Sequence, residues 1–259
     1  MGLLEGKCGI ILGVANDRSI AWHIARNARA QGARCGFSCL PGEKMEQRVR
    51  KTLADGGVED SWLVPCDASR DEDLDALFEA VARDFGSIDF VVHSLAFADR
   101  TSLTPGTFSG TPRAVFAQAL DVSAYTLIAV ADRAARLMPQ GGSVLSLSYY
   151  GSEKVMPGYN VMGVAKAALE ASTRYLAAEL GEQGVRVNTL SAGPCRTLAA
   201  KAVGDVERMF ETVEERAPLR RNIETDEVGK AAVYLLSDLS SGVTGETHYV
   251  DAGFHIMGI

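Results

Sequence analysis

The sequence predicts an α/β fold: one doubly wound domain with a seven-stranded parallel sheet and helices on both faces. Short apolar runs alternate with helical patterns along all 259 residues, and each parallel strand needs such a crossing helix before the next one. No linker rich in proline, glycine or serine divides the chain, and no internal repeat is present. With 47% hydrophobic residues the chain can bury one large core, so we expect a single domain over residues 1–259.

The composition excludes several kinds of partner and site. There are 26 lysines and arginines against 33 acidic residues, a net charge of −7, whereas a nucleic-acid partner needs a basic face. The five cysteines form no CxxC pair, which suits buried thiols in a reducing compartment. We recognise neither an eighteen-residue apolar span nor a signal peptide, so we expect a soluble, cytoplasmic protein without a membrane partner. No metal site is expected, because the histidines are few and scattered, at His23, His93, His248 and His255.

The first strand, turn and helix have the order of a phosphate-binding unit. An apolar strand over residues 8–12 leads into Gly13, and a helical pattern then runs through residue 30. In this arrangement the free N–H groups of the helix and its dipole meet a pyrophosphate. The full G-x-G-x-x-G fingerprint is absent, and Ser19 stands where a glycine could open the helix, as a good N-cap whose hydroxyl could also contact phosphate. An ordinary loop is the alternative.

The second strand, over residues 33–39, ends at a position that selects the cofactor. In dinucleotide-binding folds an acid after this strand selects NAD, and a basic residue there accommodates the extra phosphate of NADP. Leu40 is neither, and the nearest cation is Lys44, inside the next segment. The sequence therefore favours NADH over NADPH.

A third strand over residues 61–65 leads to Asp67, which is either a plain loop acid or an acceptor for the adenine amino group. Ser69 and Glu72 predict a capping box for a helix that runs to about residue 85. The fourth strand is predicted over residues 88–93. The residues that follow it, 94–98, are mostly small and apolar, which would let a planar ring of a ligand lie against their backbone. A long loop over 99–112 and a helix over 113–137 follow.

The most informative stretch follows the fifth strand, over residues 143–147. Tyr149 comes at the end of this strand, and Tyr159 and Lys166 lie at the start of a long helix that continues to residue 180. Seven residues at 100° each fall only about 20° short of two turns, so Tyr159 and Lys166 share one face. An ammonium beside a phenol lowers the pKa of the phenol. The alternative is a packing tyrosine beside a solvated lysine.

A sixth strand over residues 185–190 leads into a turn and then an amphipathic segment, 198–221. An insertion after the carboxyl end of a strand is a candidate substrate lid, so we expect a lid over residues 195–221, with a packed surface helix as the alternative. Thr225 is a predicted N-cap of another helix, and residues 247–250 predict the last strand.

Taken together, these motifs resemble the short-chain dehydrogenase/reductases, which have Rossmann-type folds, and within them the NADH-dependent enoyl-acyl-carrier-protein reductases of bacterial fatty acid synthesis. The nearest alternative is a 3-oxoacyl or ketone reductase of the same superfamily. Those enzymes place lysine four residues after the tyrosine, where this chain has Gly163. They also have a serine that assists catalysis thirteen residues before the tyrosine, and Ser146 does occupy that position here. The resemblance rests on Gly13-x5-Ser19-Ile20-Ala21, Cys66-Asp67, residues 93–98, Ser148-Tyr149, Tyr159-x6-Lys166, residues 185–188, residues 191–199 and residues 250–254.

The resemblance implies roles for individual residues. Hydride would reach the β-carbon of a trans-2-enoyl thioester, Tyr159 would donate a hydrogen bond to the thioester oxygen, and Lys166 would hold the nicotinamide ribose. Tyr149 would border the acyl pocket and complete the catalytic set, and Ala98 would contact the substrate. The implied cofactor-binding residues are Gly13, Ser19, Ile20, Leu40, Asp67, Ala68, Ser94, Leu95, Lys166, Cys195, Arg196, Thr197, Leu198 and Ala199.

The resemblance also implies partners: an enoyl thioester on acyl-carrier protein and, by analogy, a homotetramer. Acyl-carrier protein is acidic, so docking on this acidic chain needs a local basic patch. Cys195 is expected to be a small apolar filler rather than a nucleophile. A catalytically silent, cofactor-binding paralogue is the alternative from another functional class. The candidate docking patch is Lys201, Arg208, Arg220 and Arg221.

Overall fold

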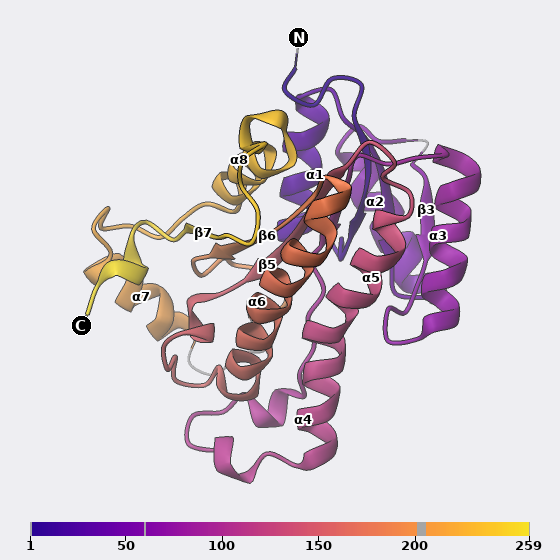
Figure 1. The fold of residues 1–259 in the computed structure, drawn as a ribbon. Coiled ribbons are helices and arrows are strands. Elements are labelled where there is room, and N and C mark those ends of the chain that lie inside the picture. The colour runs from indigo at the N-terminus through magenta and orange to yellow at the C-terminus, as the bar shows by residue number, and fades with distance from the viewer. Residues whose placement is uncertain (1, 60, 201–205, 259) are drawn as a thin grey trace.

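A seven-stranded parallel sheet forms the centre of the computed structural model, which describes residues 2–59, 61–200 and 206–258 (Figure 1). The strand order is β3-β2-β1-β4-β5-β6-β7, so the direction of winding reverses between β1 and β4. A doubly wound sheet binds its ligand in the crevice at such a reversal. This confirms the predicted fold class. The strands are β1 Cys8–Leu12, β2 Arg34–Cys39, β3 Leu63–Pro65, β4 Phe90–His93, β5 Gly142–Ser148, β6 Val185–Ala192 and β7 Thr247–Val250.

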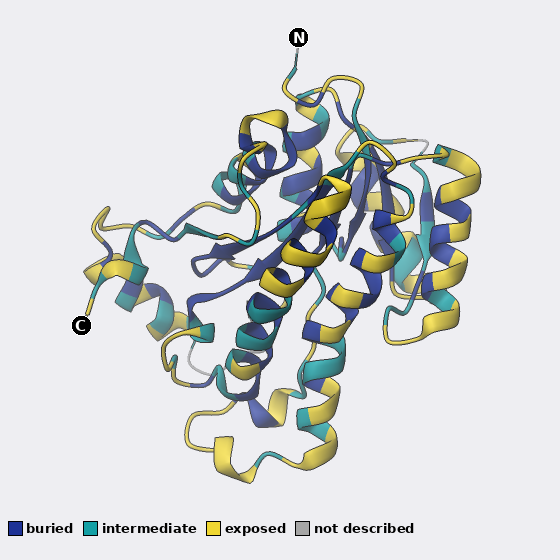
Figure 2. Cartoon of the chain, in the orientation of Figure 1, coloured by how far each residue is buried: buried dark blue, intermediate teal, exposed yellow. Residues whose placement is uncertain are grey.

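Helices cover both faces of the sheet and bury an apolar core on each side (Figure 2). Helices α1, α2 and α8 pack on one face through residues such as Ile24, Leu53 and Leu236. Helices α3, α5 and α6 cover the other face through residues such as Leu77 and Val130. The helices are α1 Ile20–Ala30, α2 Glu43–Asp55, α3 Asp71–Phe85, α4 Arg113–Leu120, α5 Thr126–Ala135, α6 Asn160–Leu180, α7 Val206–Arg216 and α8 Thr225–Leu236.

The helix predicted over residues 113–137 is interrupted. A π turn over Asp121–Tyr125 separates α4 from α5 and places Ser123 in the core. The Ser123 hydroxyl accepts a hydrogen bond from the Phe97 N–H at 3.0 Å and donates one to the Phe97 carbonyl at 3.1 Å. The wider turn thus holds the segment that leaves β4, and π turns of this kind are frequent at functional sites.

The same stretch corrects the expectation that the chain lacks a long apolar span. Within the described residues, the helical stretch 113–135 is long and apolar enough to cross a membrane, by length and composition alone. Of its most apolar window 44% is buried inside the protein, and the buried side of α5 packs with α3 and α6. A core helix passes the same test, so this stretch is weak evidence for a membrane span.

A third, smaller core cluster lies beyond the end of the sheet. Leu103, from the loop before α4, packs against Ala119 of α4 and Met162 of α6, and Tyr159 lies against this cluster. Figure 1 shows α4 and the preceding loop reaching past the end of the sheet. The cluster therefore joins the loop, α4 and α6 beside the two tyrosines.

Candidate active site

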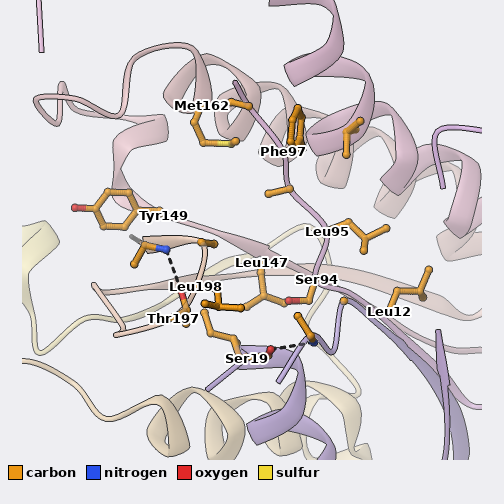
Figure 3. Close-up of a pocket in the computed structure, with 18 of the residues that line it drawn as sticks. Leu12, Ser19, Ser94, Leu95, Phe97, Leu147, Tyr149, Met162, Thr197 and Leu198 are labelled. Atoms are coloured by element: carbon orange, nitrogen blue, oxygen red, sulfur yellow. Dashed lines mark hydrogen bonds between the residues drawn. The ribbon is translucent and has the colours of Figure 1, made fainter. Parts of the chain in front are cut away.

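A cavity of about 790 Å³ opens at the carboxyl ends of β1, β4, β5 and β6, within the size range of cofactor and ligand sites. Figure 3 shows Ser19 on one side of it, Tyr149 and Met162 on the opposite side, and Leu147 between them. All of the predicted site residues except Arg196 line this cavity: Gly13, Ser19, Ile20, Leu40, Asp67, Ala68, Ser94, Leu95, Ala98, Tyr149, Tyr159, Lys166, Cys195, Thr197, Leu198 and Ala199.

The turn between β1 and α1 requires glycine at its first position. Gly13 has a φ of +100°, and a Cβ there would lie 2.1 Å from the carbonyl oxygen of Ser94. The Ser19 side chain does not cap α1 as predicted, because its Oγ accepts the N–H groups of Ala15 and Asn16, both at 3.0 Å. The first turn of α1 also contains no acid. The helix N-terminus therefore remains suited to an anion.

Leu40 and Asp67, which follow β2 and β3, both line the cavity. The predicted capping box of Ser69 does not form, because Ser69 donates its hydroxyl to Asp67 Oδ1 at 2.7 Å and α3 begins two residues later, at Asp71. A capping box instead opens α8, where Glu224 rather than Thr225 is the N-cap.

The catalytic candidates converge from the end of β5 and the start of α6. Tyr149 directly follows β5, and Tyr159 is the N-cap of α6, with the two rings edge-to-face at 4.9 Å between centroids. Lys166 is 5% exposed, and its ammonium donates to the carbonyl of Leu147 at 2.6 Å. Tyr159 and Lys166 both line the cavity, as predicted. Helix α6 carries the two residues, and the carbonyl of Leu147 in β5 holds the ammonium of Lys166.

The electrostatics differ from the expectation for Tyr159. Burial raises the pKa of its phenol above the ordinary value, and the neighbouring Tyr149 and Glu170 raise it further. Burial also lowers the pKa of Lys166 to about 8, against the opposing effect of the Glu170 carboxylate. The prediction that the ammonium lowers the pKa of the phenol was wrong, because burial disfavours the charged phenolate and Lys166 is not among the groups that shift this pKa. Tyr159 is therefore a neutral hydrogen-bond donor.

Two glycines make room for the Tyr159 ring. A Cβ on Gly151 would lie 2.4 Å from Tyr159 Cδ1, and a Cβ on Gly163 would lie 2.6 Å from the carbonyl oxygen of Gly151. A lysine at position 163 is therefore excluded by the backbone of the loop that carries Tyr149 and Tyr159. The packing explains why the ammonium comes from Lys166, one helical turn further along.

Several residues of the site were not singled out from the sequence. Glu170 is 6% exposed, lies one turn after Lys166, and accepts a hydrogen bond from the Ser148 hydroxyl. Its i+4 spacing from Lys166 was readable in the sequence as a signal. Glu170 acts on the site through Lys166, whereas Val122 and Leu103 line the cavity directly; these two residues come from a π turn and a loop that carry no such pattern.

The segment after β6 only partly matches its prediction. Arg196 points away from the cavity lining: its guanidinium pairs with Glu207 of α7 at 2.9 and 3.1 Å and lies 4.3 Å from the centre of the Phe210 ring. Cys195 is buried, and burial raises the pKa of its thiol to about 11, which suits the predicted filler.

Two residues of the predicted docking patch have partners within the protein. Arg221 forms two hydrogen bonds of 2.7 Å with Glu227, so much of its charge is neutralised. Arg220 donates to the Glu215 carbonyl, and Lys201 lies outside the described residues.

Comparison with known proteins agrees with this geometry. The profile of a family described as Enoyl-(Acyl carrier protein) reductase matches residues 13–255. Enoyl-acyl-carrier-protein reductase (NADH) 1 of Rhizobium meliloti is 51% identical over 258 residues, covering 100% of this chain and 93% of that protein. The NADH enoyl-acyl-carrier-protein reductase FabI of Bacillus cereus is 50% identical, with 100% of both chains covered.

Solved structures of the same kind superpose closely. The Bacillus cereus reductase, solved with NADP+ and indole naphthyridinone, has a TM-score of 0.96 at 49% identity and full coverage of both chains. The enzyme of Anaplasma phagocytophilum, solved in complex with NAD, has a TM-score of 0.94 at 48% identity and covers 100% of this chain and 97% of its own. The cavity, the spacing of its tyrosine and lysine, and these likenesses show that the chain belongs to the enoyl-acyl-carrier-protein reductase family.

Proposed function

We infer that the chain reduces trans-2-enoyl thioesters carried on acyl-carrier protein with NADH, the last reduction of the fatty acid elongation cycle. One observation carries the inference: Tyr159 and Lys166, seven residues apart, line the same cavity, while the backbone of Gly151 excludes a lysine at position 163. The relatives named above as NADH-dependent enoyl-acyl-carrier-protein reductases match over the whole chain.

The residues present fit a dinucleotide. The pyrophosphate would lie at the N-terminus of α1, where Gly13 lets the turn pack against the Ser94 carbonyl and Ser19 shapes the same turn. Leu40, Asp67 and Leu95 would surround the adenosine, and the backbone near Cys195 would face the carboxamide. Leu40 supplies no cation for a 2′-phosphate, which supports NADH. When bound, the cofactor supplies the hydride for the β-carbon.

The chain's own residues would stabilise the charge that develops during reduction. Tyr159, kept neutral by burial, would donate its phenolic hydrogen to the thioester oxygen. A donor aimed at a charge that appears only as the reaction proceeds lowers the barrier without tightening substrate binding equally. Lys166, held by the Leu147 carbonyl, would add a positive field and hold the ribose hydroxyls. Tyr149 would border the acyl group.

The structure argues against the ketone-reductase alternative. Ser146 is fully buried, and its hydroxyl lies 2.7 Å from Thr189 Oγ1 and 3.5 Å from Thr173 Oγ1. Ser146, the residue at the position of the catalytic serine of ketone reductases, is thus bonded to other side chains of the core and does not line the cavity. The silent-paralogue alternative is opposed by Tyr149, Tyr159 and Lys166 all meeting in one cavity.

The test is the loss of NADH absorbance with crotonyl-coenzyme A and with a longer enoyl thioester. We expect turnover by the wild type and a fall in kcat of about 10²-fold or more in Tyr159→Phe, the usual effect of removing one oxyanion donor. Tyr150→Phe is the control. NADH binding, followed by fluorescence, should be unchanged in both variants. A wild-type protein that binds NADH but leaves every enoyl thioester intact would support the silent paralogue.

We also propose that the protein is cytoplasmic and assembles as a homotetramer. The outward sides of α5 and α6 expose large apolar side chains, among them Ile128, Val164 and Tyr175, which would be covered by another subunit. Light scattering should give four times the chain mass of 27.6 kDa, and Tyr175→Glu should lower it. A monomeric mass for the wild type would contradict the assembly.

A further inference from the structure

Asn160, the residue that follows Tyr159, has an unusual backbone. It opens α6 with a φ of +43°, in the left-handed region that residues other than glycine seldom adopt. Asparagine tolerates this region better than most residues, but a strained conformation persists only where surrounding contacts hold it. The contacts of its side chain supply that restraint.

The side-chain amide of Asn160 binds a loop that is distant in sequence. Its Nδ2 group donates to the carbonyl oxygens of Ser102 at 2.9 Å and Thr104 at 2.8 Å, and to Thr107 Oγ1 at 3.2 Å. The two carbonyls flank Leu103, which is 4% exposed. Asn160 therefore grips the loop on both sides of the one apolar side chain that anchors it in the small core cluster.

The chemistry of the contact specifies an amide. All three partners are acceptors here, because Thr107 Oγ1 gives its own hydrogen to the Thr104 carbonyl at 2.7 Å. A carboxylate in place of the amide would face two carbonyl oxygens without a hydrogen to donate. Within the described residues, each side-chain hydrogen bond that joins the loop 99–112 to α6 comes from Asn160.

The loop that Asn160 holds, residues 99–107, forms part of the wall of the cavity. Asp99, Arg100 and Leu103 all line the cavity, and Leu103 packs in one cluster with Met162, which also lines it. The loop's other side-chain bonds are local, such as Asp99 to Thr101 and Thr111 to the Phe108 carbonyl. Without Asn160, the position of this wall relative to Tyr159 would depend on packing, chiefly that of the buried Ser102 and Leu103.

We propose that Asn160 is a positioning residue that holds the loop 99–107 and so fixes Leu103, the apolar residue of this loop at the cavity, against which the acyl chain of the substrate lies. This inference rests on the proposed function. Because an apolar wall contacts more of a long chain than of a short one, the loss of Asn160 should impair long substrates selectively.

Asn160→Gly tests the proposal, because glycine adopts the left-handed backbone without strain and removes only the three hydrogen bonds. We expect the KM for dodecenoyl-coenzyme A to rise about tenfold, equivalent to about 1.4 kcal/mol. The KM for crotonyl-coenzyme A, kcat and the Kd of NADH should each change less than threefold. Asn160→Asp should match Asn160→Gly, and Thr107→Val, which removes one partner, should have an intermediate effect. Thr111→Val, which breaks a bond inside the loop, is the matched control.

Limited trypsin digestion tests the same contact without turnover. Arg100 is exposed within the loop, so cleavage after it should be faster in Asn160→Gly and Asn160→Asp than in the wild type and Thr111→Val. Unchanged cleavage together with an unchanged ratio of the two KM values would overturn the proposal, and so would an equal rise of KM for both chain lengths. If the wild type reduces no thioester, the proposed function fails, while the digestion still decides whether Asn160 holds the loop.

Discussion

The ammonium of Lys166 lies 2.6 Å from the carbonyl oxygen of Leu147, so the end of a central strand holds a buried positive charge at the wall of the cavity. The partial charge of one carbonyl does not replace the water that the ammonium loses on burial. The Glu170 carboxylate, one helical turn away, supplies further compensation. Burial and the Glu170 carboxylate together set the pKa of Lys166 at about 8, so its protonation changes with pH near neutrality.

The first prediction concerns pH. The pKa of Lys166 is lowered to about 8, so the protonated form, which the proposed function requires, predominates below pH 8, and we expect kcat/KM to fall as the pH rises through that value. Glu170→Gln removes a carboxylate that raises this pKa, so it should move the fall to lower pH. Glu179→Gln, exposed on the same helix, is the control. Profiles of kcat/KM from pH 6 to 10 measure the shift, and identical profiles for all three proteins would contradict the role of Glu170.

The second prediction concerns the space beside Tyr159. Gly151→Ala would place a Cβ 2.4 Å from the ring, so the phenol must move. Because a displacement of about 1 Å at a catalytic group costs about 10²-fold in rate, we expect kcat to fall by that order. Gly181→Ala, where a Cβ meets nothing within 4 Å, should keep full activity. Wild-type kcat in Gly151→Ala would mean that the observed packing does not position the phenol.

The third prediction concerns stability in acid. His93 is fully buried, with Nε2 2.8 Å from Thr126 Oγ1, and burial lowers its pKa to about 3, with Lys166 contributing. Between pH 3 and 6.5 the imidazole of His93 binds a proton in the unfolded chain but not in the folded chain. The free energy of unfolding therefore falls as the pH drops below 6.5, by at most about 1.4 kcal/mol per pH unit from this residue.

His93→Gln should reduce that loss, since glutamine donates to Thr126 without titrating. Urea unfolding at pH 7 and pH 5 measures the difference, with the partly exposed His248→Gln as the control. The prediction fails if His93→Gln and the wild type lose the same stability between these pH values.

The fourth prediction concerns the choice of cofactor. Leu40 follows β2, lines the cavity and is 55% exposed, so an arginine there can reach a 2′-phosphate. Leu40→Arg should raise the ratio of kcat/KM for NADPH over NADH about tenfold, equivalent to about 1.4 kcal/mol. Leu40→Met controls for the change of side-chain shape. If the ratio of kcat/KM for NADPH over NADH did not change, the adenosine ribose would not lie beside residue 40.

The strands, and the meeting of Tyr159 and Lys166 in one cavity, were predictable because their signals are local in sequence; most of the other site residues followed only from the family resemblance. Each of the seven predicted strands is present, within about two residues at its ends, since short apolar runs between helical patterns leave few alternatives. Tyr159 and Lys166 were predictable because helical geometry fixes which residues share a face. The spacing alone also separated this chain from the ketone reductases, and the clash at Gly163 supplies the physical reason.

The features that were missed depend on tertiary contacts. Nothing in residues 113–137 signals the π turn, because its stability comes from the bonds of Ser123 to Phe97, which lies 26 residues away. The raised pKa of Tyr159 depends on burial that only packing reveals. Arg196 matches the sequence motif, but Glu207 and Phe210 draw its side chain away from the cavity.

The extra residue in the π turn at 121–125 also limits which deletions the chain can tolerate. Deleting one residue there would replace the π turn with a regular α-helical turn and leave the helices on either side close to their present register. The Ser123 hydroxyl would then lose its place between the N–H and the carbonyl of Phe97. A shortening that makes the helix more regular would therefore release the segment that leaves β4 beside the cavity.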